Sequence, residues 1–434
     1  MVPLFPDDIA ALLLPQPNTS LRIPPSAFSR FDYYAKWVRY LQVWSFDPDA
    51  RIARILSASR PGVILFPSLE SIHLGADDNS LHMASPFLSP SLHLVRVNHW
   101  DAGTPTVLQS APSVTETLLQ ILRLPELDRL DLLDTRLPSY EHDPVVVDAF
   151  VRAASRVRQL FSLDFVTQRP VFDVLAKSTR LTAVFLDLTL EGDHHYGFNE
   201  IVRRVKHDFV RLNHLVIQAT NLRGIDLLRE TRKTLKRVDF RVHGPFEPAL
   251  LLKLTRALQP SANTLRVFRC STSERGDHSK RTSLVDALGP LREMHQLQKI
   301  VMTITVHGED MLVDEQVEDL FRSWPRLNVW VLESDPEDGT PIDATSPTYG
   351  LTLQSLLTIR LCCPELTELS IPYIGTTAIP SLTSLPFTPS LLPFDLRLSR
   401  THAHNRRAIT RFVHELWPKA ECSFEDCVCP ELEN

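Results

Sequence analysis

The stretch L-P-E-L-D-R-L-D-L at residues 124–132 decides the fold that we expect for this chain. Its last six residues read L-x-x-L-x-L, and every gap holds a charged residue. Consecutive side chains of a β-strand point to opposite faces. Leu130 and Leu132 are therefore expected on one face, and Arg129 and Asp131 on the other. The stretch predicts a strand with a buried apolar face and a charged open face.

The same three apolar positions recur along the chain, and a recurrence of this kind predicts a repeat architecture. Successive matches begin roughly 21 to 39 residues apart, within or above the range of about 20–29 residues for leucine-rich repeats. The first positions of the matches are Val38, Leu69, Leu92, Leu127, Leu160, Leu181, Leu212, Leu235, Leu265, Leu297, Leu327, Leu366 and Leu391.

Segments with helical periodicity are expected between these strands. Ser113 and Glu116 form a capping box, and Asp143 followed by proline is typical of a helix start. Further helices are expected near residues 198–209, 248–258, 283–294, 314–324, 351–361 and 405–417. A doubly wound sheet also alternates strands and helices, but it does not need the same three apolar positions at each strand. The pattern favours an α/β leucine-rich-repeat solenoid, curved, with a concave parallel sheet and convex helices.

The bulk composition excludes several classes of function. The chain has 434 residues, 43% hydrophobic and 23% charged, with a net charge of −6, so nucleic-acid binding is not expected. No apolar run approaches the ~20 residues of a membrane span, and no membrane association is expected. The first residues are acidic and lack a signal-peptide pattern. We expect a cytoplasmic or nuclear protein.

Three segments resemble a known family. Residues 30–41, R-F-D-Y-Y-A-K-W-V-R-Y-L, resemble the start of the repeat region in basidiomycete fungal F-box/leucine-rich-repeat-like proteins. Residues 65–74, L-F-P-S-L-E-S-I-H-L, resemble the family's second repeat, and residues 412–418, F-V-H-E-L-W-P, its last helix. The resemblance implies the substrate-binding part of an F-box-type ubiquitin ligase receptor, in which the F-box binds the adaptor subunit of a cullin ligase.

The beginning of the sequence departs from that family. Residues 4–9, L-F-P-D-D-I, resemble the start of an F-box, but no second half with its tryptophan follows. A lost F-box, a shortened gene model and a stand-alone scaffold or regulator with no ubiquitin-ligase link stay open as alternatives. Residues 1–36 are expected to form an N-terminal cap or a diverged F-box remnant. Residues 37–420 are expected to form the solenoid, and residues 421–434 a C-terminal tail.

The sequence carries none of the common catalytic motifs: no P-loop, H-E-x-x-H, G-x-S-x-G or Rossmann fingerprint. A non-enzymatic protein without a cofactor is expected. Cys422, Cys427 and Cys429 match no standard zinc spacing, so a tail is favoured over a metal site. His194 and His195 are expected in a solvated loop. Three cysteines in or beside repeat strands are expected to be buried thiols, and they are Cys270, Cys362 and Cys363.

The open face of the expected sheet is the surface on which we expect a protein ligand to bind. The candidate partner-binding residues are Arg96, Arg129, Phe185, His214, Arg237, Arg241, Arg269 and Lys299. Neighbouring strands lie about 5 Å apart, so the last four form a basic zone, and arginine suits carboxylates or phosphates. The alternative interpretation is a solvated strand face without a partner.

Overall fold

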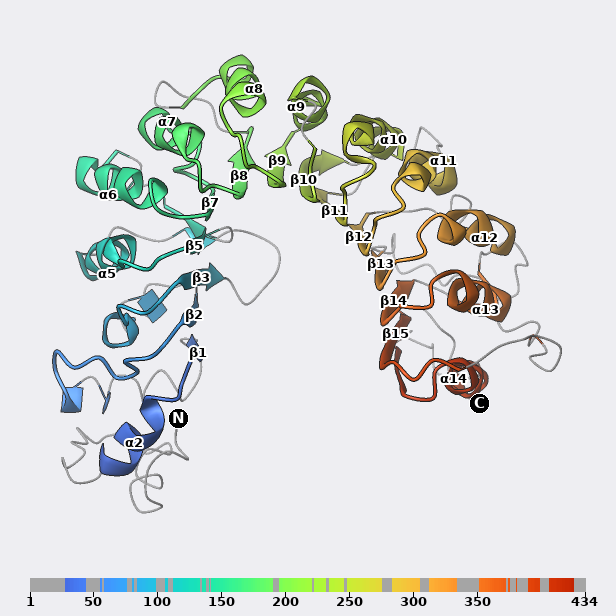
Figure 1. The fold of residues 1–434 in the computed structure, drawn as a ribbon, viewed down its shortest axis with the longest axis horizontal. Helices are drawn as coiled ribbons and strands as arrows, with labels where there is room; N and C mark the ends of the chain where they lie inside the picture. Colours follow the sequence, from blue (N-terminus) through green and yellow to red (C-terminus); the bar gives the residue numbers. More distant parts are fainter. Residues whose placement is uncertain are drawn as a thin grey trace, which may run out of the picture. The chain divides into compact units, whose positions relative to one another are not determined.

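The computed structural model describes most of the chain. The described residues are 28–43, 55–56, 58–75, 80–81, 84–98, 106–107, 112–132, 135–137, 140, 142–189, 195–220, 222–231, 234–245, 248–274, 283–304, 312–333, 351–371, 374, 380, 389–398 and 406–424. They fall into two compact units, Met1–Leu212 and Asn213–Asn434. Each unit repeats the same alternation of strand and helix (Figure 1).

The first unit contains a parallel sheet whose strands pair in chain order. These strands are β1 (Tyr40–Val43), β2 (Ser71–Gly75), β3 (Leu94–Asn98), β5 (Arg129–Leu132), β7 (Gln159–Ser162) and β8 (Ala183–Asp187). A short parallel pair joins β4 (Thr106–Val107) to β6 (Thr135–Arg136). The helices are α2 (Phe28–Ala35), α5 (Pro112–Arg123), α6 (Pro144–Ala154), α7 (Arg169–Lys177) and α8 (Phe198–His207), with a 3-10 turn, η3 (Ser85–Phe87).

The second unit repeats the arrangement. Its parallel strands, again paired in chain order, are β9 (His214–Ala219), β10 (Arg237–Pro245), β11 (Val267–Glu274), β12 (Lys299–Thr303), β13 (Val329–Glu333), β14 (Glu368–Ile371), β15 (Phe394–Leu398) and β16 (Ala420–Phe424). The helices are α9 (Arg223–Thr231), α10 (Pro248–Ala257), α11 (Leu284–Leu288), α12 (Asp314–Arg322), α13 (Leu353–Cys362) and α14 (Arg406–Leu416), with 3-10 turns η5 (Gln259–Ser261) and η6 (Gly289–Glu293).

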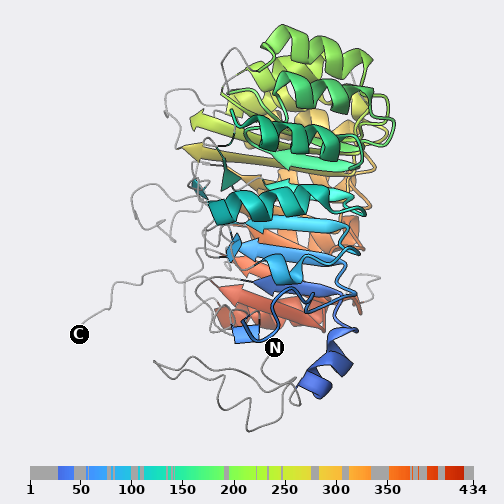
Figure 2. The same ribbon diagram turned by 90° about the vertical axis from the view of Figure 1, so that its left-hand side faces the viewer.

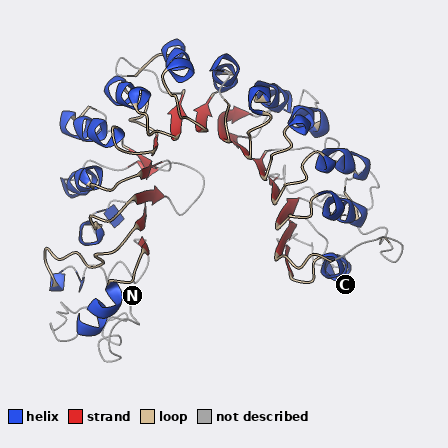
Figure 3. Cartoon of the chain, in the orientation of Figure 1, coloured by secondary structure: helices blue, strands red, loops and turns tan. Residues whose placement is uncertain are grey.

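In each unit the helices cover one face of the sheet, and the described residues place no helix on the other face (Figure 3). The strands of each unit point in the same direction (Figure 2). Strands lie about 4.8 Å apart, whereas a helix with its side chains is about 10 Å wide. Each sheet therefore curves with its strands on the inner side. The fold is an α/β leucine-rich-repeat solenoid with a concave parallel sheet and convex helices, as the sequence predicts.

The repeat positions form the core because the register aligns them from strand to strand. Leu130 of β5 pairs with Val95 of β3 and Leu160 of β7, and all three are fully buried. In the second unit Ile300 pairs with Trp330, whose ring stacks on Trp324 at 5.6 Å between centroids. Each repeat thus buries its apolar side chains against its neighbours, which is how a solenoid is stabilised.

The helix boundaries agree with the sequence in part. The predicted cap at Asp143 is confirmed, since its carboxylate accepts hydrogen bonds from the backbone N–H groups of Val145 and Val146. The predicted cap at Ser113 is wrong, because α5 already includes Pro112. Helices α7 and α9 were not expected. Both are short, and α7 has proline in its first turn without a capping side chain.

Three strand assignments differ from the sequence interpretation. Leu160, rather than Leu163, pairs with Leu130, so the register of that repeat is three residues earlier than predicted. In the observed register the third position of the repeat is Ser162, whereas Leu163 and Phe165 make the predicted register apolar at all three positions, which is why the sequence pointed to the wrong register.

In the last predicted repeat Leu396, rather than Phe394, pairs with Leu369, so the register is two residues later than predicted, and Leu391 is exposed. Strand β16 also extends the second unit's sheet into the expected C-terminal tail, where it pairs with β15.

Candidate functional site

The sheet face of the second unit on which the described residues place no helix carries rows of side chains set by the strand register. One row follows the pairing of the strands, and its members are His214, Arg237, Val267, Lys299, Val329, Glu368, Asp395 and Glu421. The next row lies two residues further along each strand, and its members are Val216, Asp239, Arg269, Val301, Val331, Ser370, Arg397 and Ser423.

Asp239 is the centre of the basic part of this face. Its side chain is only 13% exposed, and Arg237 Nη2 donates a hydrogen bond to Asp239 Oδ2 at 2.6 Å. His214 Nε2 lies 3.5 Å from Oδ2, and Arg269 Nε lies 4.0 Å from Oδ1. A buried carboxylate is costly unless it is paired. Groups from three strands, β9, β10 and β11, therefore surround the Asp239 carboxylate.

The balance of charges sets the protonation of Asp239. Burial alone raises the pKa of this carboxyl, but the hydrogen bonds from His214 and Arg237 and the charge of Arg237 outweigh it and hold the pKa well below its ordinary value. The group is thus a permanent anion in the neutral range. A carboxylate held in this way is a poor proton acceptor, so the cluster suits charge positioning rather than general-base catalysis.

Arg269 and Lys299 complete the basic zone. Arg269 Nε is buried, and in the described part of the chain no acceptor lies within hydrogen-bond distance of it. The ammonium group of Lys299 makes no ion pair within the described ranges. Burial, followed by the charge of Arg269, lowers the pKa of Lys299. Arg241, two residues beyond Asp239 on β10, adds a further cation to the same face.

The other end of the face is acidic. Glu368 of β14 pairs in register with Asp395 of β15, and Asp395 pairs with Glu421 of β16. Arg397 Nη2 donates to Asp395 Oδ2 at 2.6 Å and lies 3.5 Å from Glu368 Oε1. One arginine therefore serves two carboxylates here, and Glu421 adds a third carboxylate to the same row. The face is positive at β10–β12 and negative at β14–β16.

The first unit holds the predicted residues Arg96 and Arg129 in a comparable cluster. Arg96 Nε donates to Asp131 Oδ2 at 3.0 Å, and Arg129 Nη2 donates to the same oxygen at 2.9 Å. The guanidinium of Arg129 also lies over the ring of Phe161, 5.3 Å from its centroid. Both arginines are thus engaged by a carboxylate whose side chain is 7% exposed.

His73 lies beside that cluster on β2. Tyr40 Oη is 3.1 Å from His73 Nδ1, and the two rings meet edge to face. Burial, followed by the nearby charge of Arg96, lowers the pKa of His73. The histidine is therefore neutral at pH 7, and it adds no positive charge to the first unit's face.

Two sequence expectations are corrected by burial. Phe185 occupies an open-face position of β8, but its side chain is fully buried and offers no surface to a partner. His195 is buried rather than solvated, and its Nδ1 lies 2.9 Å from Thr167 Oγ1. Apolar neighbours explain the first case, because Phe161 on β7 is buried as well.

Among the described residues, cysteines and metal ligands form no second site. Cys270 is buried, and burial raises the pKa of its thiol. Cys363 Sγ donates to the carbonyl of Trp324 at 3.3 Å, which is a structural role. The described ranges contain no group of three metal-ligating side chains. His194, Cys427 and Cys429 lie outside the described residues.

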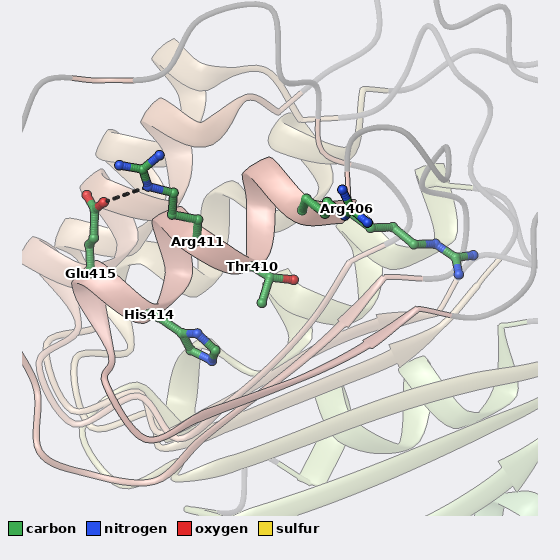
Figure 4. A pocket seen from close by; sticks show the side chains of 6 residues that line it. Arg406, Thr410, Arg411, His414 and Glu415 are labelled. Atoms are coloured by element: carbon green, nitrogen blue, oxygen red, sulfur yellow. Dashed lines mark ion pairs between the residues drawn. The ribbon is translucent and has the colours of Figure 1, made fainter.

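A shallow hollow of about 610 Å³ lies along α14 (Figure 4). Its lining residues are Arg406, Arg407, Thr410, Arg411, His414 and Glu415. Arg411 pairs with Glu415 one turn away at 3.6 Å, and His414 Nε2 lies 3.2 Å from the carbonyl oxygen of Ala420. A single helix lines the hollow and its polar groups do not converge, so it is not a built ligand site.

Comparisons with known proteins add the following. No family model matches the chain, and no curated protein matches its sequence. A chain in the crystal structure of the Rad7 and Elc1 complex in yeast is similar, with 12% sequence identity and a TM-score of 0.41, over 89% of this chain and 85% of that one. A leucine-rich-repeat protein of Leptospira interrogans matches with 10% identity and a TM-score of 0.29, over 93% of this chain and 100% of that one.

The part of the chain that the structure describes has no helix with the length and apolarity needed to cross a bilayer.

Proposed function

We propose that the chain is a non-enzymatic protein-recognition solenoid that binds a protein ligand on the concave strand face of its second unit. One observation carries the proposal: cations from three consecutive strands, β10 to β12, lie on the sheet face on which the described residues place no helix, and two of them, Arg237 and Arg269, lie at a single buried carboxylate. Arg237 is used by Asp239, whereas Arg269 and Lys299 keep donors for a ligand. Charged groups of this kind steer partners and fix their register.

The proposal extends to the cellular role. The resemblance of residues 30–41, 65–74 and 412–418 to F-box/leucine-rich-repeat-like proteins supports the substrate-binding part of an F-box-type ubiquitin ligase receptor, acting in the cytoplasm or nucleus. Helix α2, at the start of the first of these segments, buries Phe31 against Phe66 at 5.5 Å between ring centroids, and so packs on the first repeats. A stand-alone scaffold with the same binding face is the alternative role.

A pull-down tests the binding face. The tagged chain is used to capture partners from an extract of the source organism, alongside the variant Arg269→Gln/Lys299→Glu. The matched control is Lys253→Glu/Arg256→Glu, because both residues are exposed on α10, on the convex side of the same unit. The proposal predicts that the first variant loses partners that the control retains. Equal capture of partners by both variants would contradict the proposed binding face.

The ligase role has its own readout. The same eluates are probed for the adaptor subunit of the cullin ligase. Co-purification that persists in the Arg269→Gln/Lys299→Glu variant supports a receptor whose adaptor contact is separate from its ligand face. Absence of the adaptor from every eluate, while other partners are retained, leaves the stand-alone scaffold.

A further inference from the structure

The concave face of the second unit is electrically polarised, and its polarity specifies a ligand. We infer that this face binds an extended peptide segment of a partner protein that is acidic at one end, aliphatic in the middle and basic at the other end. The acidic end lies over β10–β12 and the basic end over β14–β15. The inference rests on the proposed function and names the kind of segment that the site takes.

The positive end has more cations than its single carboxylate can satisfy. Arg237 hydrogen-bonds to Asp239, but Arg269 only approaches it, at 4.0 Å. Lys299 is one strand further away and forms no ion pair with any described residue. The Arg269 side chain is 42% exposed and Lys299 is half-buried, so both can reach a ligand on the open face. Carboxylates of a ligand, placed over β11 and β12, supply the acceptors.

The negative end has the opposite excess. Arg397 is held by Asp395 at 2.6 Å and lies 3.5 Å from Glu368, so one guanidinium serves both strands. Glu421, next in the row on β16, is exposed. A lysine or arginine of a ligand is therefore attracted to β14–β15 and repelled from β10–β12. Like-charge contacts discriminate strongly against wrong partners.

Valines lie within the positive end and between it and the negative end. Val267 lies between Arg237 and Lys299 in one row, and Val329 lies between Lys299 and Glu368. In the adjacent row Val301 and Val331 are paired neighbours. Val331 is buried at 6% exposure and the other three are half-buried. This floor gives aliphatic side chains of the ligand an apolar contact, as at the centre of other protein interfaces.

The strand spacing sets the length of the segment. Lys299 on β12 and Glu368 on β14 are two strands apart, about 10 Å, and Arg237 on β10 and Asp395 on β15 are five apart, about 24 Å. An extended chain advances about 3.3 Å per residue. The acidic and basic residues of the ligand are therefore separated by about three to seven residues.

Synthetic peptides test the inference. Fluorescein-labelled peptides carry two glutamates, a spacer of valine and alanine, and two lysines, with spacers of two, five and ten residues. A peptide of the same composition with alternating charges is the control. Binding to the full chain is measured by fluorescence anisotropy at 50 mM and 300 mM salt. The five-residue spacer is expected to bind at least tenfold more tightly than the alternating control, and more weakly at the higher salt.

Charge variants assign the two ends. Lys299→Glu and Glu368→Lys are each expected to weaken binding of the five-residue peptide about tenfold, whereas Lys253→Glu leaves it unchanged. Lys299→Glu is further expected to bind a peptide with lysines at both ends more tightly than the unaltered chain does, a gain that misfolding cannot produce. Lys299→Gln and Glu368→Gln are the milder pair for use if a reversal lowers the thermal stability of the chain.

Two outcomes overturn the inference. The first outcome is equal affinity for the five-residue-spacer peptide and the alternating peptide, which would show that the face does not recognise the order of charges in the ligand. The second outcome is that an all-glutamate peptide binds most tightly and that Glu368→Lys does not change its affinity. The face would then be a purely cationic site. In both cases the proposed function survives if the pull-down still depends on Arg269 and Lys299. The proposed function also fails only if substitution of Arg269 and Lys299 leaves the capture of partners unchanged.

Discussion

The two units arrive at the same local arrangement and differ in what surrounds it. Each has an arginine two residues before an aspartate on one strand, Arg129 with Asp131 and Arg237 with Asp239, and the aspartates are 7% and 13% exposed. In each case an adjacent strand adds a second arginine, Arg96 in the first unit and Arg269 in the second.

The surroundings decide what each cluster can do. In the first unit both arginines reach one carboxylate oxygen, a ring lies under Arg129, and His73 is neutral. In the second unit Arg269 stays at 4.0 Å from Asp239, and Lys299 lies beyond it. An Arg-x-Asp pair is therefore a structural device by itself. It becomes a binding site only where further cations exceed the acceptors.

The largest expected effect on stability distinguishes buried from solvent-accessible positions on the strand faces. Phe185→Ala in the first unit removes a fully buried ring and is expected to lower the free energy of unfolding by about 3–5 kcal/mol. Val267→Ala, at a half-buried open-face position of the second unit, is expected to cost about 1 kcal/mol. Urea denaturation measures both. A loss below that of Val267→Ala would show that Phe185 is not a core residue.

The two carboxylates come next. Asp131→Ala and Asp239→Ala each leave arginines without their buried partner, and each is expected to cost about 2 kcal/mol, less than a fully buried pair because the arginines are partly exposed. Urea midpoints give the loss. The matched control is Asp148→Ala, whose carboxylate is exposed on α6 and whose removal is expected to be nearly neutral. A loss for Asp148→Ala as large as for the two buried aspartates would contradict the argument.

The two clusters are expected to lose stability in different pH ranges. His73 has a lowered pKa in the folded chain, so the unfolded chain takes up its proton first, and stability falls as pH drops below about 6.5. Asp239 also has a lowered pKa, so its contribution is present above about pH 4 and is lost below it. Urea midpoints from pH 7 to 3 should therefore show two steps, and His73→Gln should remove the upper one. An upper step that persists in that variant would assign it to another group.

The smallest expected effect on stability is at Lys299. Lys299→Gln breaks no ion pair of the described chain and is expected to change stability by less than about 0.5 kcal/mol. Arg96→Gln removes a hydrogen bond to a buried carboxylate and is expected to cost about 1–2 kcal/mol. In the pull-down the order is reversed, with Lys299→Gln weakening capture and Arg96→Gln leaving it intact. The same order in both assays would erase the distinction between the clusters.

The sequence predicted the architecture because the repeat reports it directly. Leu130 and Leu132 point into the core and Arg129 to the open face, as alternation requires. The positions of Arg237, Arg269 and Lys299 on neighbouring strands were predicted for the same reason. The alternation of side chains along a strand and the alignment of neighbouring strands are enough to predict both the core positions and the open-face positions.

Burial and register of individual residues did not follow from the sequence. Phe185 has an open-face position, but the apolar neighbour Phe161 makes that part of the face a core. The register at Leu160 was predicted wrongly because Leu163 and Phe165 fit the repeat pattern, whereas the observed register places Ser162 at an apolar position. The role of Asp239 depends on His214 and Arg269 from other strands. Contacts between distant segments carry this information, and one segment alone does not.

The most direct test of the account is lysine labelling with and without the captured partner. Purified chain, free and in complex, is treated briefly with an amine-reactive reagent, and modification of Lys299 and Lys253 is quantified by mass spectrometry. The account predicts that the partner lowers labelling of Lys299 severalfold and leaves Lys253 on α10 unchanged. Unchanged labelling of Lys299 together with protection of Lys253 would place the partner on the convex face and contradict the account.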